Sequence, residues 1–475
     1  MRRAKIVCTL GPSAESLEQL RALIAAGMDV ARLNLSHGDY PEHLMRYNNV
    51  RQAADESGRG VGILVDLQGP KIRTGRFTNG KETLVNGQTF TITIDDIQGD
   101  NTRCSTTFKG LPGDVTPGDM ILIDDGRIAL KATSVTATDV VTVVVEAGVI
   151  SNNKGINLPG VAVSVPALSE KDMDDLRWGL RTGVDMIALS FVRSAADIID
   201  VHRIMDEEGI RLPVIAKIEK PQAVENLDEI VDAFDAIMVA RGDLGVELPL
   251  EQVPLVQKRC VAAARAASKP VIVATQMLDS MITATRPTRA EASDVANAVL
   301  DGADALMLSG ETSVGDHPTV VVSTMARIIE HVEEEALGRL PKIPKEKSTS
   351  TARAVTHSAT VVGDAVNASH LVAFTETGLS ARLMSRHRNA IPVLAFTPNP
   401  RVRSQLALVW GVETFLVNKV THTDDMVAQL DTALLEIGRV SIGEKIVLVA
   451  GVPPGIPGTT NGFRVHVVGS NRHGI

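Results

Sequence analysis

Short runs of β-forming residues alternate with helical patterns along the first two thirds of this chain. The eight runs span residues 5–10, 29–35, 62–67, 185–190, 213–219, 236–240, 271–275 and 304–309. Between most of them lie stretches with apolar residues at helical spacing, such as residues 170–182 and 288–301. This alternation predicts parallel strands with crossover helices, and eight such strands close a (β/α)8, or TIM, barrel of the α/β class. An open doubly wound sheet is the alternative.

Residues able to do chemistry stand at or just past the ends of four of these runs. They are Lys217, Glu219, Asp243, Thr275, Ser309 and Glu311. In a closed parallel barrel the carboxyl ends of all strands emerge on one face, where the connecting loops build the active site. We therefore expect these side chains to meet in one catalytic pocket.

Two further regions break the alternation and predict two more domains. Residues 70–166 have no helical periodicity but contain period-two runs at 89–94, 120–123 and 140–146, which predicts an inserted all-β domain, expected as a small β-barrel. It leaves the predicted barrel (residues 1–69 and 167–340) on the catalytic face, so it is placed to act as a lid. A linker at 342–347 then opens a carboxyl-terminal α/β domain, residues 341–475.

Composition excludes several classes of function. The chain has 475 residues, is 44% hydrophobic and 22% charged, and carries a net charge of -9, which argues against general affinity for nucleic acid or acidic membranes. Its cysteines, Cys8, Cys104 and Cys260, have no paired spacing, so neither a disulfide framework nor a zinc site is expected. No leader and no long apolar segment is evident, and we expect a cytoplasmic protein.

Glu219 and Asp243 form a candidate metal site. They end neighbouring predicted strands, and two carboxylates can share a Mg²⁺ ion, or Mn²⁺ in its place, that takes its other ligands from water or substrate. Either carboxylate alone is more typical of a helix cap or a solvated loop. Lys217 would place an ammonium beside the ion and neutralise a phosphoryl group during transfer.

Other side chains at the same face suit anionic substrates and cations. The guanidinium of Arg32 is shaped for phosphate or carboxylate. Asn34, Ser36 and Asp66 offer oxygens for a monovalent cation or an ammonium group. Lys71 and Arg73 enter the predicted lid and Lys154 leaves it, which suits a nucleotide polyphosphate bound between lid and barrel. The alternative is that they are ordinary solvated surface residues.

Two hydroxyls and a carboxylate at the last two strand ends could relay a proton to carbon. These are Thr275, Ser309 and Glu311, although hydroxyls in such places are more often helix caps. His37 either contacts a nucleotide or is a hydrogen-bonded structural histidine. No P-loop and no protein-kinase signature is present, so a nucleotide would be held in another way.

The chain resembles the pyruvate kinase family along essentially its whole length. The resemblance rests on eight motifs: residues 31–38 (ARLNLSHG), 66–75, 154–160 (KGINLPG), 216–219 (AKIE), 238–247 (MVARGDLGVE), 274–278 (ATQML), 286–291 (RPTRAE) and 308–312 (LSGET). Long motifs in consistent order are far more specific than any single short pattern. The family architecture is the predicted one of barrel, β lid and carboxyl-terminal α/β domain.

The resemblance implies transfer of phosphate from phosphoenolpyruvate to ADP, giving pyruvate and ATP. By motif, Glu219 and Asp243 would hold Mg²⁺ and Lys217 would stabilise the transferring group. The residues implied for phosphoenolpyruvate are Arg32, Lys217, Gly242, Asp243 and Thr275, and those for the nucleotide are Asn34, His37, Arg73 and Lys154. The enolate would be protonated from the side of Thr275, Ser309 and Glu311, with the donor left open.

One position departs from the potassium-dependent members of that family. The chain has Lys71 where they have Glu, and Leu67-Gln68 where they have Thr-Lys. The implied pocket for a monovalent cation consists of Asn34, Ser36, Asp66 and Leu67. An ammonium close to this pocket would supply the charge of K⁺, so we expect activity that does not require K⁺.

Regulation and assembly are further expectations from the resemblance. The amides and hydroxyls of residues 375–381 would cradle a phosphate through Thr375, Thr377, Gly378 and Ser380. Glu376 and Leu379 stand where fructose bisphosphate-regulated members often have basic residues, so AMP or a sugar monophosphate is the preferred allosteric effector. A homotetramer is expected.

Two other classes of protein remain as alternatives. A carbon-carbon lyase on a phosphoenolpyruvate- or pyruvate-binding barrel would use similar carboxylates and an Arg, but it would not need a lid carrying Arg73 and Lys154. A non-catalytic metabolite sensor would be a degenerate kinase. Degeneration is argued against by the intact set of Lys217, Glu219, Asp243 and Thr275.

Overall fold

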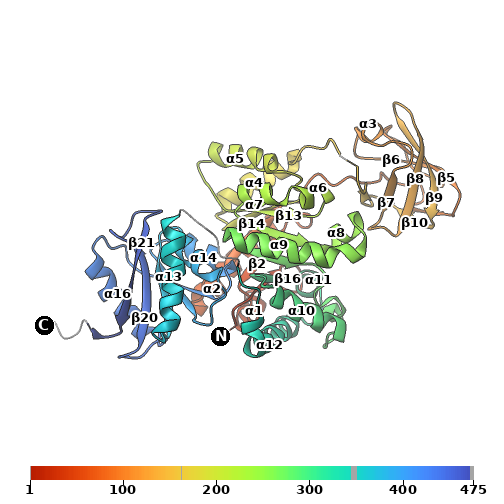
Figure 1. The fold of residues 1–475 in the computed structure, drawn as a ribbon. Coiled ribbons are helices and arrows are strands. Elements are labelled where there is room, and N and C mark those ends of the chain that lie inside the picture. The colour runs from red at the N-terminus through yellow and green to blue at the C-terminus, as the bar shows by residue number, and fades with distance from the viewer. Residues whose placement is uncertain (1, 162, 344–349, 471–475) are drawn as a thin grey trace.

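Eight parallel strands close into a barrel at the centre of the molecule (Figure 1). The structure is a computed structural model that describes residues 2–161, 163–343 and 350–470. The barrel strands are β1 (Lys5–Thr9), β2 (Val30–Asn34), β3 (Gly62–Asp66), β12 (Met186–Leu189), β13 (Val214–Ile218), β14 (Ala236–Ala240), β15 (Val271–Ala274) and β16 (Ala305–Leu308). Their order, β1-β16-β15-β14-β13-β12-β3-β2, confirms the predicted closed barrel and excludes the open sheet.

Helices surround the barrel, and several begin and end where side chains satisfy the free backbone groups. Ser16, Ser169 and Thr288 form capping boxes, and Gly183 and Gly302 end helices in the left-handed conformation. The longer helices are α1 (Leu17–Ala26), α2 (Tyr40–Ser57), α4 (Glu170–Thr182), α5 (Ile198–Glu207), α7 (Leu227–Ala233), α9 (Val253–Ala267), α10 (Arg289–Asp301) and α12 (Pro318–Ala336). Shorter ones are α6 (Pro221–Glu225), α8 (Arg241–Glu247), α11 (Gly310–Ser313), η1 (Ala195–Asp197), η2 (Leu250–Gln252), η3 (Asp279–Ile282) and η4 (Leu337–Arg339).

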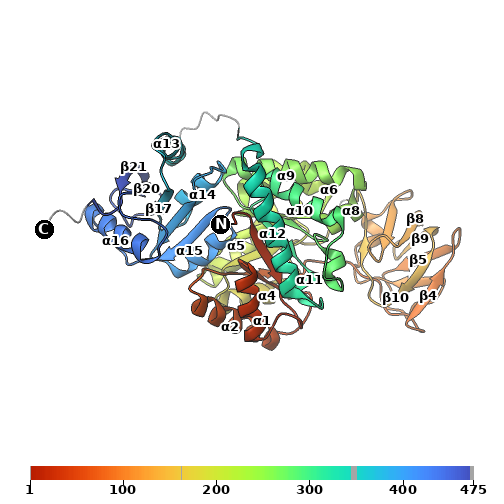
Figure 2. The ribbon, with the colours of Figure 1, turned by 90° about the horizontal axis from the view of Figure 1, so that it is seen from below.

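The inserted segment is a sheet-rich domain that projects from the barrel on the side opposite the carboxyl-terminal domain (Figures 1 and 2). Its elements are β4 (Lys81–Leu84), β5 (Thr89–Thr93), β6 (Arg103–Ser105), α3 (Leu111–Asp114), β7 (Met120–Ile123), β8 (Ile128–Val135), β9 (Asp139–Glu146), β10 (Gly148–Ser151) and β11 (Ile156–Asn157). They form a six-stranded sheet, β11-β7-β8-β9-β5-β6, and a separate pair, β10-β4. Isolated bridges also pair Thr74 with Thr106, directly after β6, and Arg73 with Gly155, directly before β11, so both edges of the six-stranded sheet meet the same segment. The closed β-barrel expected for the lid stays a prediction.

The carboxyl-terminal domain is an α/β sheet, as predicted. Its strands are β17 (His370–Phe374), β18 (Val393–Thr397), β19 (Val412–Leu416), β20 (Lys445–Gly451) and β21 (Thr460–Val467), in the order β19-β18-β17-β20-β21 with only β21 antiparallel. Its helices are α13 (Thr351–Ala365), α14 (Leu379–Ser385), α15 (Pro400–Gln405), η5 (Leu406–Leu408) and α16 (Thr423–Glu436). The predicted linker at 342–347 lies mostly outside the described residues.

The carboxyl-terminal domain closes the amino-end face of the barrel. Ala407 and Leu408 of η5 belong to the same apolar cluster as Val7, Val30 and Leu64, whose side chains fill the barrel. Apolar side chains removed from water in this way stabilise the contact between the two domains.

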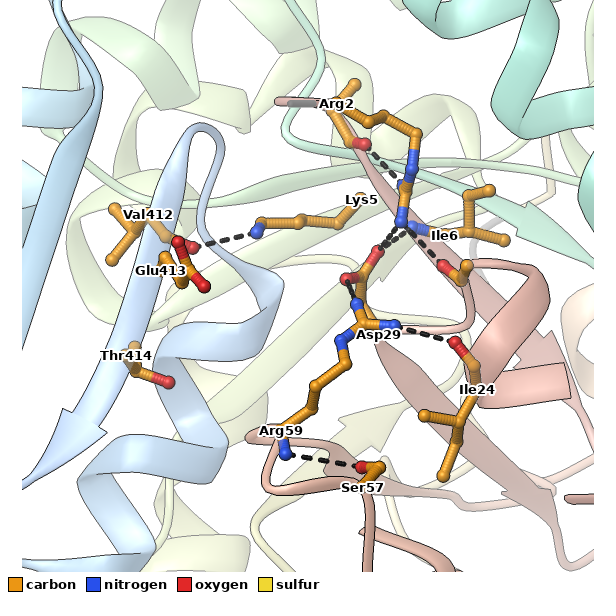
Figure 3. A network of polar contacts seen from close by, with 12 residues as sticks. Arg2, Lys5, Ile6, Ile24, Asp29, Ser57, Arg59, Val412, Glu413 and Thr414 are labelled. Atoms are coloured by element: carbon orange, nitrogen blue, oxygen red, sulfur yellow. Dashed lines mark hydrogen bonds and ion pairs between the residues drawn. The ribbon is translucent and has the colours of Figure 1, made fainter. Parts of the chain in front are cut away.

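A polar network borders the same contact (Figure 3). The Asp29 carboxylate lies 2.6 Å from the Arg2 guanidinium and 3.0 Å from that of Arg59, while Lys5 Nζ donates a 2.8 Å hydrogen bond to the Val412 carbonyl of β19. Burial alone would raise the pKa of Asp29, but the surrounding cations hold it below its ordinary value. No helix among the described residues is long and apolar enough to cross a membrane.

Candidate active site

A buried cluster of charged side chains lies at the carboxyl ends of β2, β3 and β13. Asp66, the last residue of β3, is fully buried and accepts hydrogen bonds of 2.7 Å from Arg32. Arg32 stands in the middle of β2 rather than at its end, and it also donates to the Thr9 hydroxyl at 2.9 Å. Burial alone would raise the pKa of Asp66, but the charges of Lys217 and Arg32 hold it below its ordinary value. Asp66 therefore fixes the Arg32 guanidinium in a single orientation.

Lys217 lies at the centre of the cluster. Its Nζ is 3.0 Å from Glu219 Oε1 and 3.3 Å from Asp66 Oδ1. Burial alone would lower the pKa of this ammonium, but Asp66 and Glu219 raise it above its ordinary value. Lys217 is therefore a permanent, desolvated positive charge, which is what a site for anionic groups requires.

Ser190 is a site residue that sequence reasoning missed. Its hydroxyl accepts a 2.7 Å hydrogen bond from Lys217 Nζ and donates a 2.7 Å hydrogen bond to the carbonyl of Leu67. It directly follows β12, between β3 and β13 in the barrel order. The sequence feature that could have identified Ser190 is a hydroxyl residue at the end of a predicted barrel strand, because the ends of β12 and β13 meet at one face of the barrel.

Glu219 and Asp243 come from neighbouring strand ends, as the sequence predicts. Glu219 is almost completely buried, and its Oε2 accepts a 2.6 Å hydrogen bond from the backbone N–H of Phe191, a residue with φ 55°. Burial and the negative charge of Asp243 raise the pKa of Glu219, against the opposite effect of Lys217. A cation bound beside Glu219 and Asp243 would offset the repulsion between these two carboxylates.

The donor set fits a magnesium ion. No group of three or more His, Cys, Asp or Glu that could hold a metal occurs within the described residues. A pair of carboxylates is sufficient for Mg²⁺, because that ion keeps several waters or takes substrate oxygens. Glu219 and Asp243 are the residues that would hold it.

Thr275 contacts the segment that carries Asp243. Its Oγ1 accepts a 2.7 Å hydrogen bond from the backbone N–H of Gly242, and a Cβ at Gly242 would lie only 3.2 Å from this oxygen. Thr275 and Gln276 have φ values of 71° and 55°, in the left-handed region. The structure therefore brings Thr275, Gly242 and Asp243 together, as the sequence predicts.

Ser309 and Glu311 lie just past β16. Glu311 is 1% exposed and accepts hydrogen bonds from the backbone N–H groups of Ser309 (2.6 Å) and Leu278 (3.2 Å). Burial raises its pKa. The Ser309 hydroxyl is buried and has no hydrogen-bond partner among the described residues, so it is available to a bound molecule.

Three cations belong to the lid and its hinge. Lys154 Nζ lies 2.9 Å from Asp124, and Arg73 donates to the Asn153 carbonyl at 3.1 Å, so both are held by lid residues. The side chain of Lys71 has no hydrogen bond or ion pair within the part of the chain described, and its Cε packs beside Gly155. Arg32 and Lys217 are the cations that pair with Asp66, and no ion pair joins Lys71 to Asp66 within the described residues. The role of Lys71 as a substitute for K⁺ stays a prediction.

The remaining predicted residues of the nucleotide and cation sites lie along the loop after β2. The Asn34 side chain accepts a 3.3 Å hydrogen bond from the Ser36 N–H, and the exposed His37 donates its backbone N–H to the Asn34 carbonyl. Leu67 is buried and offers only its carbonyl, which Ser190 already contacts.

The predicted phosphate loop follows β17 and opens α14. Thr375 Oγ1 accepts a 2.9 Å hydrogen bond from the N–H of Gly378, whose φ is 80°, and the buried Ser380 hydroxyl lies 2.7 Å from that of Thr460. Thr377 is exposed and uses its carbonyl to accept from Arg382. The loop borders a cavity shared with residues 454–460.

Fold and site together define an enzyme of the (β/α)8-barrel class, with buried opposite charges at the carboxyl ends of the strands and an inserted lid beyond them. Comparison with known proteins narrows this class. The family model for the pyruvate kinase barrel domain matches residues 1–322, and the model for the pyruvate kinase alpha/beta domain matches residues 353–466. The chain belongs to the pyruvate kinase family.

Individual relatives support the assignment. The chain is 57% identical over 470 residues to a pyruvate kinase of Corynebacterium glutamicum, covering 99% of this chain and 98% of the relative. It is 56% identical over 472 residues to a pyruvate kinase of Mycobacterium tuberculosis, covering 99% of each. The crystal structure of a pyruvate kinase from Cryptosporidium parvum has a TM-score of 0.92 and 37% identity, covering 98% of this chain and 96% of that one.

Proposed function

We propose that this enzyme transfers the phosphoryl group of phosphoenolpyruvate to ADP, giving ATP and pyruvate, in a Mg²⁺-dependent reaction. One observation carries the proposal: Lys217 is a buried ammonium held between Glu219, Asp66 and Ser190. Phosphoryl transfer needs positive charge and alignment more than covalent help from the protein. A fixed ammonium beside a metal-binding carboxylate provides both.

Two cations of the chain would bind and stabilise the phosphoryl group. Arg32 is held by Asp66 and Thr9, so its guanidinium is oriented before substrate arrives and little entropy is lost on binding. Lys217 would neutralise the group as it leaves the enolate oxygen. Ser190 and two carboxylates already fix Lys217 Nζ, so the ammonium does not need to move during the reaction.

Glu219 and Asp243 would hold Mg²⁺, which when bound withdraws electron density from phosphoryl and carboxylate oxygens. The backbone N–H of Phe191 fixes Glu219 Oε2 and leaves Oε1 toward Lys217. Gly242 admits a substrate because it has no side chain, and its N–H holds the Thr275 hydroxyl.

The enolate carbon would take its proton from the side of Thr275, Ser309 and Glu311. The buried Ser309 hydroxyl, which has no hydrogen-bond partner among the residues that the structure describes, can bind a water or the substrate itself. Glu311, whose pKa burial raises, can hold a proton near this hydroxyl. These groups organise the donor, whose chemical identity we leave open.

The lid would deliver the nucleotide contacts. Arg73 and Lys154 are carried by the lid, and Asn34 and His37 by the barrel, so ADP bound by all four would bridge the two domains. Lid closure over such a site also excludes water, which would otherwise take the phosphoryl group.

Several finer properties complete the proposal. We propose activity without K⁺, a phosphorylated effector such as AMP or a sugar monophosphate at the loop of Thr375, Thr377, Gly378 and Ser380, a homotetramer, and a cytoplasmic location. We also propose domain limits at 1–69 with 167–340 for the barrel, 70–166 for the lid and 341–475 for the last domain.

Product stoichiometry tests the reaction. Pyruvate and ATP are both measured after mixing enzyme, phosphoenolpyruvate, ADP and Mg²⁺, with parallel samples that lack ADP or contain EDTA. We expect one ATP per pyruvate, and no product without ADP or with EDTA. Pyruvate formed without ATP would contradict the proposal and indicate hydrolysis, whereas no product under any condition, with AMP and glucose 6-phosphate also tried, would favour a sensor.

A further inference from the structure

Arg241, the residue before Gly242, does not face the substrate groups but the strained turn that carries Thr275. Its NH2 group donates a 2.9 Å hydrogen bond to the Thr275 carbonyl and lies 2.8 Å from Met277 Sδ. Its Nε donates to the Ala274 carbonyl at 3.4 Å. One planar guanidinium thus contacts three of the four residues from 274 to 277.

Asp294 of α10 holds this guanidinium from the other side. Its two carboxylate oxygens each lie 2.7 Å from an Arg241 nitrogen, a bidentate arrangement that fixes the plane of the group. The Arg241 side chain is only 14% exposed, so without Asp294 it would be a largely buried cation without a counter-charge among the described residues.

The turn that Arg241 contacts needs such support. Thr275 and Gln276 both have positive φ, 71° and 55°, and a β-branched residue in that region is a clear outlier. Strained backbone of this kind persists only where surrounding contacts enforce it. Because the turn sets the direction of the Thr275 side chain, its support also sets the Thr275 hydroxyl 2.7 Å from the Gly242 N–H.

Helix α10 is itself anchored to the same loop. Glu291, in its first turn, accepts hydrogen bonds of 2.7 and 2.5 Å from the backbone N–H and the hydroxyl of Ser280. It also completes the capping box with Thr288. The helix that carries Asp294 is therefore fixed relative to the loop from 274 to 282 at a second point.

We propose that Arg241 and Asp294 are positioning residues that hold Thr275 in its working orientation against Gly242 and Asp243. The inference rests on the proposed function, since it assumes that Thr275 contacts the substrate. Asp294 acts through Arg241, and Arg241 acts through the carbonyls of Ala274 and Thr275. Neither side chain needs to touch phosphoenolpyruvate or ADP.

A double-mutant cycle tests this chain of contacts. We compare kcat and KM for wild type, Asp294→Asn, Thr275→Ala and the double variant. Asp294→Asn keeps the shape but removes one oxygen acceptor and the charge, so kcat should fall about tenfold while KM for ADP stays within about twofold. If Asp294 works through Thr275, the double variant should be no slower than Thr275→Ala alone, within about twofold.

Controls separate positioning from general stability. Glu208→Gln breaks another bidentate pair, between Glu208 at the end of α5 and the exposed Arg181 of α4, and should leave kcat unchanged. Thermal unfolding is recorded for every variant, and if Asp294→Asn does not fold, the cycle is run with Asp294→Glu. Losses that multiply in the double variant, or an Asp294 variant with normal kcat, would overturn the proposal. Failure of the wild type to form pyruvate and ATP would instead refute the proposed reaction.

Discussion

Five charged side chains decide the electrostatic balance of the site: Arg32, Lys217, Asp66, Glu219 and Asp243. With all of them ionised the group carries one excess negative charge before any ligand binds. A monovalent cation, or a lysine that approaches when the lid closes, would neutralise it. Lys71 stands at the hinge of the lid and makes no ion pair within the described residues, so it is free to play this part.

Lys71→Glu should therefore make activity depend on K⁺. The substitution replaces the neutralising ammonium by a second excess negative charge, which K⁺ bound near Asp66 would offset. The initial rate is measured in buffer whose only monovalent cation is tetramethylammonium, and again after addition of KCl. We expect full wild-type activity before KCl, and variant activity only after it. Equal rates of the variant in both buffers would discard the role assigned to Lys71.

Asp185, at the opposite end of the barrel, should make stability depend on pH. Burial raises its pKa to about 6, although the side chain lies 2.9 Å from Arg51 and accepts a 2.7 Å hydrogen bond from the Ile63 N–H. The native state then binds the proton more tightly than the unfolded state does. Its contribution to the free energy of unfolding is therefore largest below about pH 4 and is lost as pH rises through about 6.

Asp185→Asn should remove this dependence. Between about pH 4 and 6 the wild type should lose up to about 3 kcal/mol of unfolding free energy relative to the variant. Urea unfolding at a series of pH values measures the difference. Asp206→Asn, on an exposed surface pair with Arg211, is the matched control. Parallel pH profiles of wild type and Asp185→Asn would contradict the assignment.

At the scale of elements, the joint between β11 and α8 links lid and barrel. Asn157 Nδ2 of β11 donates a 2.9 Å hydrogen bond to Glu247 Oε1 at the end of α8. Glu247 is 5% exposed and also pairs with Lys220. Because the acceptor is a buried carboxylate, this hydrogen bond between lid and barrel is a charge-assisted one.

Asn157→Ala should loosen the lid. Arg73 and Lys154 would reach the nucleotide less often, so KM for ADP should rise about tenfold while KM for phosphoenolpyruvate changes little. Steady-state kinetics with each substrate varied in turn provides the measurement. Asn101→Ala, exposed on the lid, should behave as wild type. An unchanged KM for ADP would show that the contact does not govern closure.

The elements themselves were largely predictable, because their signals are local. The predicted helix at 170–182 matches α4, and the run at 236–240 matches β14. Interactions that depend on side-chain direction were not predictable. Ser190 contacts Lys217 only because β12 and β13 pair. Tertiary packing decides that Arg32 and Lys217 are the cations that pair with Asp66. The left-handed conformation of Thr275 has no local signal, since β-branched residues rarely adopt it.

At the scale of the whole molecule, a buried ion pair joins barrel and carboxyl-terminal domain. Arg388 lies 2.9 Å from Asp304, with side chains 2% and 5% exposed, and its guanidinium stacks over Trp410 at 4.9 Å. Asp304 also accepts a 3.0 Å hydrogen bond from the backbone N–H of Trp410. The ion pair thus links the residue before β16 to the segment that follows α14, and the hydrogen bond from Trp410 links it to the segment that follows η5.

Arg388→Ala should weaken this link strongly. Removing one partner leaves Asp304 buried without its cation, which costs about 3–5 kcal/mol. Differential scanning calorimetry should show a lower unfolding temperature, with the last domain unfolding ahead of the barrel. Arg401→Ala, exposed on α15, controls for loss of a surface arginine. A single transition at the wild-type temperature would contradict the expectation.

The closure of the barrel by Ala407 and Leu408 has a consequence during synthesis on the ribosome. All eight barrel strands have been made once Leu308 is added, but the residues that cover the amino-end face come about a hundred positions later. At about 5–20 residues per second this interval lasts roughly 5–20 s. During that interval the apolar amino-end face of the completed barrel is exposed to water and to neighbouring chains. This is the stage at which the nascent chain would most need a chaperone.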